Sequence, residues 1–245
     1  MEILLPLLVF IFGLIAGSFL NAALYRFNTG QGMGGRSHCT SCADVIKARD
    51  LIPVVSYLVL KGQCRACHSH ISLSYPLVEL SAGLLLLATY CVAPTLVIFL
   101  VHSLCWLVVL FIAVYDLRHL IIPFPFAEIL AVLTFVTLFI SEGFFTIPSY
   151  EALLAGPVTA LPLFLIALFS RGRWMGFGDW KLMLGLGWLV GFENGIGALL
   201  FSFWIGALVS VSLLIVRFRR KGRRLTMRSE VPMAPFLVAG ALLAY

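Results

Sequence analysis

The chain has 245 residues, of which 61% are apolar and 11% are charged, and its net charge is +6. Soluble domains contain about 45–50% apolar and about 25% charged residues, so this composition excludes a water-soluble globular protein. A transmembrane helix needs about 20 mostly apolar residues, and the chain has room for many such helices. The composition therefore predicts a polytopic membrane protein of the all-α class.

The first apolar stretch, residues 3–24, is long enough to cross a bilayer. It follows Glu2 instead of a basic segment and has no small-residue cleavage site, so we expect a membrane helix and not a signal peptide. The only long polar segment, residues 25–74, comes next. Together the apolar runs predict about eight transmembrane helices, two of them short, at residues 3–24, 76–93, 95–115, 125–140, 152–170, 182–191, 195–216 and 232–245.

All 17 Lys and Arg residues lie in one alternate set of predicted loops, those after the first, third, fifth and seventh apolar runs. Basic loops stay in the cytosol, so we expect these loops to be cytosolic and both termini to be external. We interpret the basic segment Arg217–Arg228 as an orientation signal near anionic lipid, and we expect no binding of nucleic acid.

The polar segment contains two C-x-x-C knuckles, Cys39–Cys42 and Cys64–Cys67. Two such pairs can present four thiolates to one tetrahedral Zn²⁺ ion. Disulfide bonds are the alternative, but the segment is expected in the reducing cytosol, where disulfides are rare. We therefore predict a closed, structural zinc site that stabilises a segment too polar to fold by hydrophobic burial alone.

Two aspartates lie at the predicted cytosolic ends of apolar runs. Asp116 closes the third run, and Asp179 precedes the sixth in Gly176-Phe-Gly-Asp179. Ionisable groups at membrane depth are costly and suggest function. Two neighbouring carboxylates can share a proton, so that one activates water while the other protonates the leaving group. The alternative is that each aspartate is a helix-end residue paired with a neighbouring Arg or Lys.

Ordered along the chain, these motifs resemble the type IV prepilin peptidases, a family of membrane aspartic proteases that also act as N-methyltransferases. Phe124 and Ala234 depart from the family pattern, which usually has a polar residue and a glycine there. The resemblance covers nearly the whole chain and rests on Gly17-Ser-Phe-Leu-Asn21, Tyr25-Arg26, Arg36-Ser-His-Cys39, the second knuckle, Tyr75-Pro-Leu-Val-Glu-Leu80, Asp116-Leu-Arg-His119, Ile122-Pro123, Gly176-Phe-Gly-Asp179 and Pro232-x-x-Pro235-Phe236.

The resemblance implies that Asp116 and Asp179 form the catalytic pair of a bacterial inner-membrane enzyme with its active site facing the cytosol. Its substrates would be prepilins of type IV pili or pseudopilins of type II secretion, cut after a glycine. The new amino terminus would then be methylated with S-adenosylmethionine as donor. Glu79 and Lys181 are weak candidates for binding that donor; a buried helix–helix partner and a snorkelling lysine are their alternatives.

The resemblance also implies three regions: a first transmembrane helix (1–24), a cytosolic zinc-binding loop associated with methyl transfer (25–75) and a membrane peptidase domain (76–245). Two other functions fit parts of the pattern. A presenilin-like intramembrane protease would place its aspartates deeper and lack the cysteine loop. A non-enzymatic membrane scaffold would use the zinc loop to dock a partner, and its aspartates would only form ion pairs.

Overall fold

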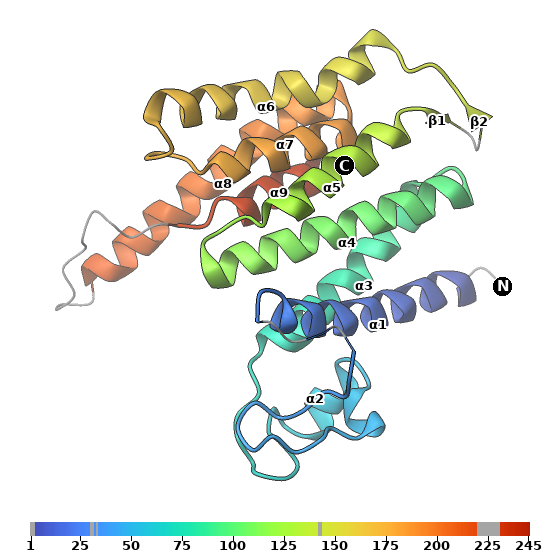
Figure 1. Ribbon diagram of the computed structural model, residues 1–245, viewed down its shortest axis with the longest axis vertical. Coiled ribbons are helices and arrows are strands. Elements are labelled where there is room, and N and C mark those ends of the chain that lie inside the picture. The colour runs from blue at the N-terminus through green and yellow to red at the C-terminus, as the bar shows by residue number, and fades with distance from the viewer. Residues whose placement is uncertain (1–2, 30–31, 33, 142–143, 220–230) are drawn as a thin grey trace. The chain divides into compact units, whose positions relative to one another are not determined.

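The computed structural model describes residues 3–29, 32, 34–141, 144–219 and 231–245, and most of the basic segment Arg217–Arg228 lies outside them. The described elements are helices, apart from one hairpin of two-residue strands, which confirms the all-α class. The chain divides into two compact units, Met1–Phe99 and Leu100–Tyr245, which are coloured blue to teal and green to red in Figure 1.

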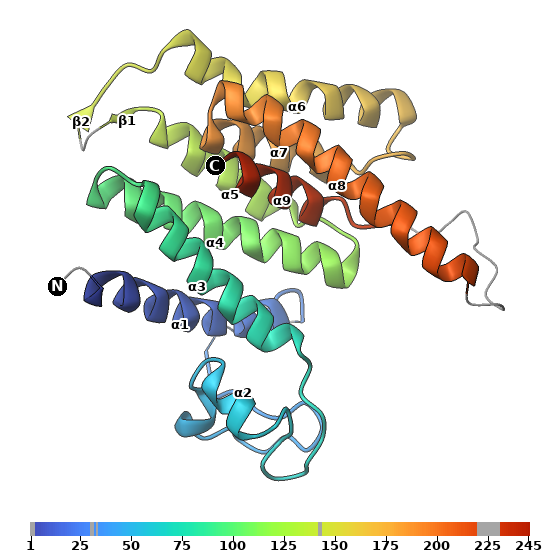
Figure 2. The same ribbon diagram turned by 180° about the vertical axis from the view of Figure 1, so that it is seen from behind.

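The first unit consists of two long helices and the polar segment between them. Helices α1 (Leu4–Arg26) and α3 (Ser74–Val92) lie side by side in both views (Figures 1 and 2). Gly17 makes this close approach possible, because a Cβ atom at that position would lie 2.7 Å from the Cα atom of Glu79. The segment between the helices forms the 3₁₀ helix η1 (Ala48–Leu51) and the short helix α2 (Val55–Val59).

The second unit is a helical bundle in which α7 packs against α5, α6, α8 and α9. The largest of its fully buried side chains include Trp106, Leu130, Leu163, Leu186 and Leu237. The boundary between the units falls within α4. The elements are α4 (Leu96–His119), α5 (Phe124–Thr137), β1 (Ile140–Ser141), β2 (Phe144–Phe145), α6 (Tyr150–Ser170), α7 (Phe177–Val190), α8 (Phe192–Arg219) and α9 (Ala234–Ala244).

Each of the eight predicted apolar runs forms a helix, but five helices are long and apolar enough to cross a membrane: α1, α3, α4, α6 and α8. Helices α5 and α9 are apolar but have 14 and 11 residues. At 1.5 Å per residue they extend about 21 Å and about 17 Å, less than a bilayer core of about 30 Å. The expected count of eight spans is therefore not confirmed.

The carboxyl ends of α4 and α6 and the amino ends of α5, α7 and α9 lie at one end of the second unit (Figure 1). Asp116 lies in the last turn of α4 and Asp179 in the first turn of α7. The up-and-down path of the chain therefore brings both predicted catalytic residues to the same end of the bundle.

Candidate functional site

The two cysteine knuckles of the first unit share one backbone hydrogen-bond pattern. In the first knuckle the N–H of Cys39 donates to the carbonyl of Asp44 at 2.9 Å, and the N–H of Ala43 donates to the carbonyl of Cys39 at 2.9 Å. The second knuckle repeats both bonds at the same spacing, through Cys64, Ser69 and His68, at 2.9 Å and 3.0 Å. Two equal turns thus present two pairs of sulfurs.

The four sulfurs of Cys39, Cys42, Cys64 and Cys67 all lie within 4.8 Å of one another and could hold a metal ion. The Sγ atoms of Cys39 and Cys67 are 3.8 Å apart. Zn–S bonds of about 2.3 Å in a tetrahedron give edges of about 3.8 Å, whereas a disulfide needs about 2.05 Å. The donor set therefore fits zinc better than the disulfide alternative.

Local hydrogen bonds favour the thiolate form of Cys39 and Cys67, whereas side-chain hydrogen bonds with these two cysteines raise the pKa of Cys42 to about 12. Backbone amides of Cys42 and Ser41 and the side chain of Ser69 lower the pKa of the Cys39 thiol to about 6. Hydrogen bonds with Ser69 also lower the pKa of Cys67. Ser69 therefore lowers the pKa of one cysteine in each knuckle.

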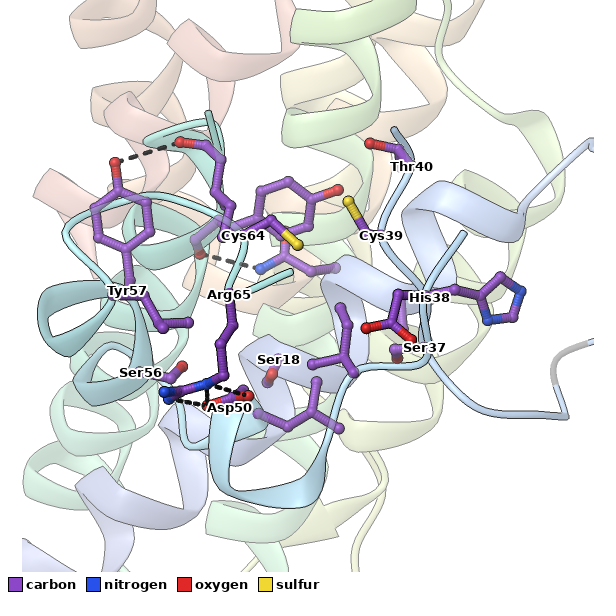
Figure 3. Close-up of a pocket in the computed structure, with 18 of the residues that line it drawn as sticks. Ser18, Ser37, His38, Cys39, Thr40, Asp50, Ser56, Tyr57, Cys64 and Arg65 are labelled. Atoms are coloured by element: carbon purple, nitrogen blue, oxygen red, sulfur yellow. Dashed lines mark hydrogen bonds and ion pairs between the residues drawn. The ribbon is translucent and has the colours of Figure 1, made fainter. Parts of the chain in front are cut away.

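An ion pair attaches the second knuckle to η1. Nη2 of Arg65 donates to Oδ1 of Asp50 at 2.7 Å, and its Nε contacts both carboxylate oxygens, as the dashed lines in Figure 3 show. This hydrogen bonding lowers the pKa of Asp50.

A cavity of about 720 Å³ lies between this segment and the helices of the first unit. Glu79 lines it from α3, where Oε2 accepts a 2.7 Å hydrogen bond from the N–H of Val54, and Ser18 lines it from α1. The sequence analysis gave a buried contact between helices as the alternative role of Glu79. The bond with Val54 shows a further role, because it attaches the polar segment to α3.

The sequence interpretation assigned no role to Asn21, which also lines this cavity. The available signals were its amide side chain at the end of an apolar run and its place in the motif Gly17-Ser-Phe-Leu-Asn21. The buried side chain donates through Nδ2 to the carbonyl of Tyr75 at 3.0 Å. Its Oδ1 atom has no partner among the described residues.

Asp116 and Asp179, both in the second unit, are only 5% and 6% exposed and lie in the last turn of α4 and the first turn of α7, at the same end of the bundle. Oδ2 of Asp116 accepts a 3.1 Å hydrogen bond from the backbone N–H of Ala234, the first residue of α9. Within the described part of the chain neither aspartate forms a salt bridge, which disfavours the ion-pair alternative. A buried carboxylate without a cationic partner is costly when it is ionised.

The two glycines before Asp179 have different surroundings. A Cβ atom on Gly178 would lie 2.6 Å from Cβ of Ile122, in the connection between α4 and α5. A Cβ atom on Gly176 would lie 3.3 Å from Oδ2 of Asp179. Gly178 thus allows close packing within the bundle, and Gly176 leaves space beside the carboxylate.

Lys181 lies less than one turn beyond Asp179 on α7 but forms contacts with α5. Its Nζ atom is 2.6 Å from Oε1 of Glu128 and 4.7 Å from the ring centre of Phe124. Phe124, one of the departures from the family pattern, therefore provides a cation–π partner. Lys181 and Glu79 belong to different units, and each has its own structural partners.

Comparison with known proteins finds similarity over most of the chain. The model of the bacterial peptidase A24 N-terminal domain matches residues 11–93, and that of the type IV leader peptidase family matches residues 102–211. A prepilin leader peptidase/N-methyltransferase of Bacillus subtilis (strain 168) is 32% identical over 97% of this chain and 92% of the relative.

Relatives of the same name are found in Aeromonas hydrophila and Pseudomonas putida. The first is 29% identical over 97% of this chain and 89% of the relative, and the second is 30% identical over 96% and 88%. No solved structure matches the chain.

Proposed function

Because this chain belongs to the type IV leader peptidase family and is a multi-pass membrane protein, we propose that it cleaves the leader from prepilins or pseudopilins after a glycine. We assign catalysis to Asp116 and Asp179. The observation that supports this assignment is the pair of buried carboxylates at one end of the bundle, neither of which has a cationic partner among the described residues. The enzyme would then be an aspartic endopeptidase.

The surroundings of the two carboxylates suggest different roles. The N–H of Ala234 stabilises negative charge on Asp116, so Asp116 is assigned as the base and Asp179 as the protonated acid. Asp116 takes a proton from water, the water oxygen bonds to the scissile carbonyl carbon, and Asp179 gives its proton to the carbonyl oxygen. On collapse the nitrogen receives the proton from Asp116, the C–N bond breaks, and Asp179 regains a proton from the hydroxyl as the carbonyl reforms.

We place this reaction at the cytosolic face of a bacterial inner membrane. The helix ends beside the aspartates also carry Arg118, Arg171, Arg173 and Lys181, and basic residues mark the cytosolic side. A prepilin that is already inserted by its apolar helix would present its leader junction at this level. Membrane insertion of the substrate would therefore limit the bonds that can reach the aspartates to those near this level.

We propose that the second activity is N-methylation of the new amino terminus, as in the names of the relatives. Cys39, Cys42, Cys64 and Cys67 would bind one zinc ion, and four protein ligands leave no position for a reacting group, so its role is structural. Bound S-adenosylmethionine would supply an electrophilic methyl group: the nitrogen lone pair forms the N–C bond, the S–C bond breaks with its electrons left on sulfur, and the extra proton on nitrogen passes to water.

A cleavage assay with purified protein and a full-length prepilin tests the main proposal. Mass spectrometry of the products should show one cut after a glycine at the leader junction. A cut within the apolar helix of the substrate would favour the presenilin-like alternative. No cleavage of any prepilin, by protein that carries its zinc, would favour a scaffold.

A further inference from the structure

An apolar run interrupts the polar segment of the first unit. It covers residues 51–60, between the two cysteine knuckles, and includes α2. Leu58 and Val59 are 67% and 68% exposed. We call the exposed apolar side chains of this run the apolar face; they are Leu51, Ile52, Val55, Leu58 and Val59. A group of exposed apolar side chains marks a surface for contact with protein or membrane.

Contacts within the first unit place this run at membrane depth. The N–H of Val54 donates to Oε2 of Glu79 on α3 at 2.7 Å. Glu79 lies opposite Gly17 of α1, because a Cβ atom on Gly17 would be 2.7 Å from the Cα atom of Glu79. Gly17 is seven residues, or about 10 Å, before Leu24, where the apolar stretch of α1 ends. Val54 is therefore bound to a residue that lies inside the apolar length of the helix pair.

The apolar face continues the outer surface of α1. Leu51 and Pro53 line one groove together with Ile15 and Phe19 of α1. Phe19 belongs to a membrane-spanning helix and is 67% exposed. Figures 1 and 2 show α2 level with the last turns of α1 and not beyond the end of that helix. The surface of the run is thus continuous with that of a helix in the bilayer, which favours lipid over a water-soluble partner.

The backbone of the run meets the requirement for contact with lipid. N–H groups in hydrocarbon need partners within the protein, because no water is there to pair with them. Those of Ser56, Leu58 and Leu60 donate to carbonyls four residues earlier at 2.9–3.1 Å. The hydroxyl of Ser56 donates to a backbone carbonyl at 2.7 Å. Val54 precedes α2, and its bond to Glu79 pairs a further N–H group that would otherwise oppose insertion.

Basic residues flank the apolar face: Lys47 and Arg49 precede it and Lys61 follows it, and all three are exposed. Interfacial segments combine an apolar face with Lys and Arg residues, which contact anionic headgroups. We propose that the apolar face inserts into the leaflet in which α1 ends and α3 begins, with these three residues at the headgroup phosphates. Insertion would hold the cysteine knuckles at the membrane surface. The inference goes beyond the two proposed activities and depends on neither.

Electron paramagnetic resonance of the full-length protein in vesicles of phosphatidylethanolamine and phosphatidylglycerol tests this insertion. A nitroxide is coupled to p-acetylphenylalanine placed singly at Ile52, Leu58 or Val59, so that the cysteines remain unlabelled. Ala66, an exposed residue of the second knuckle, carries the same label as the matched control. At the three sites of the apolar face, collisions with oxygen, which concentrates in the bilayer, should exceed those with a water-soluble nickel chelate several-fold. The order should be reversed at Ala66.

Two results would overturn the proposal. Frequent collisions with the nickel chelate at the three sites would place the apolar face in water. Rare collisions with both reagents would show that protein covers it. The three labels are read separately, so a label that lowers the unfolding temperature leaves two others for the test. The triple variant Lys47→Gln, Arg49→Gln, Lys61→Gln should lower the ratio of oxygen to nickel collisions at Val59, and an unchanged ratio would contradict the role of the basic residues.

Discussion

The backbone N–H of Ala234 donates a 3.1 Å hydrogen bond to Oδ2 of Asp116, and this bond joins the start of α9 to the end of α4. A backbone donor binds the carboxylate without adding a positive side chain that would compete for it. The bond also fixes one oxygen of Asp116 and leaves the other for water or substrate. Its geometry agrees with the assignment of Asp116 as the base.

Close packing at Gly178 should set the position of Asp179. Gly178→Ala would place a Cβ atom 2.6 Å from Ile122, so we expect a loss of about 1–3 kcal/mol in the free energy of unfolding and slower leader cleavage. Gly197→Ala is the control, because its new Cβ would have its nearest neighbour 4.0 Å away, and it should behave like wild type.

A second substitution tests the cause of the expected Gly178→Ala defect. Ile122→Ala in the Gly178→Ala background removes the atoms in conflict and should restore part of the cleavage rate. Cleavage kinetics and thermal unfolding of the four proteins would measure this coupling. Purely additive effects would show that Gly178 acts by some route other than contact with Ile122.

Zinc content tests the arrangement of the cysteines. Elemental analysis of purified protein should find about one zinc ion per chain, and Cys64→Ser should abolish it and unfold the polar segment first, since zinc supplies much of the folding free energy of such segments. Cys91→Ser, outside the cluster, should keep its zinc. Full zinc occupancy in Cys64→Ser would exclude Cys64 as a ligand.

The proposed orientation predicts the exposure of the two ends of α6. An epitope inserted at Gly172, in the turn before α7, should be protected from protease in intact spheroplasts, and one inserted after Ile147, before α6, should be cleaved. Gly172 lies on the Asp179 side of the bundle, so it reports on the location of the proposed reaction. Cleavage at Gly172 in intact spheroplasts would place the aspartates outside the cell.

The sequence predicted the helices better than the contacts between them. Apolar runs identify helices in lipid because composition alone carries that signal, and the knuckle spacing is sufficient to predict a four-cysteine cluster. The bond between Ala234 and Asp116 could not be predicted, because it uses a backbone N–H from a residue 118 positions away. The unpaired oxygen of Asn21 could not be predicted either, because its lack of a partner depends on which groups the fold places around the side chain.

The sequence also did not predict the lengths of the shorter helices. A run such as residues 125–140 is apolar enough for a membrane helix, but the observed α5 ends at Thr137, before the hairpin of β1 and β2. Lys181 shows a related limit. Its pairing with Glu128 depends on how α5 and α7 pack, and the sequence alone left a snorkelling lysine as the alternative.

The most direct test of the central claim is leader cleavage by Asp116→Asn and Asp179→Asn. An amide keeps the shape of the carboxylate but cannot take or give the proton, so each variant should lose at least about a thousandfold in cleavage rate. The double variant should be no slower than either single variant, while Glu193→Gln, an exposed acid at the start of α8, should cleave like wild type. Retained zinc and an unchanged unfolding temperature would show that the variants are folded. A folded single variant that cleaves at close to the wild-type rate would contradict the dyad.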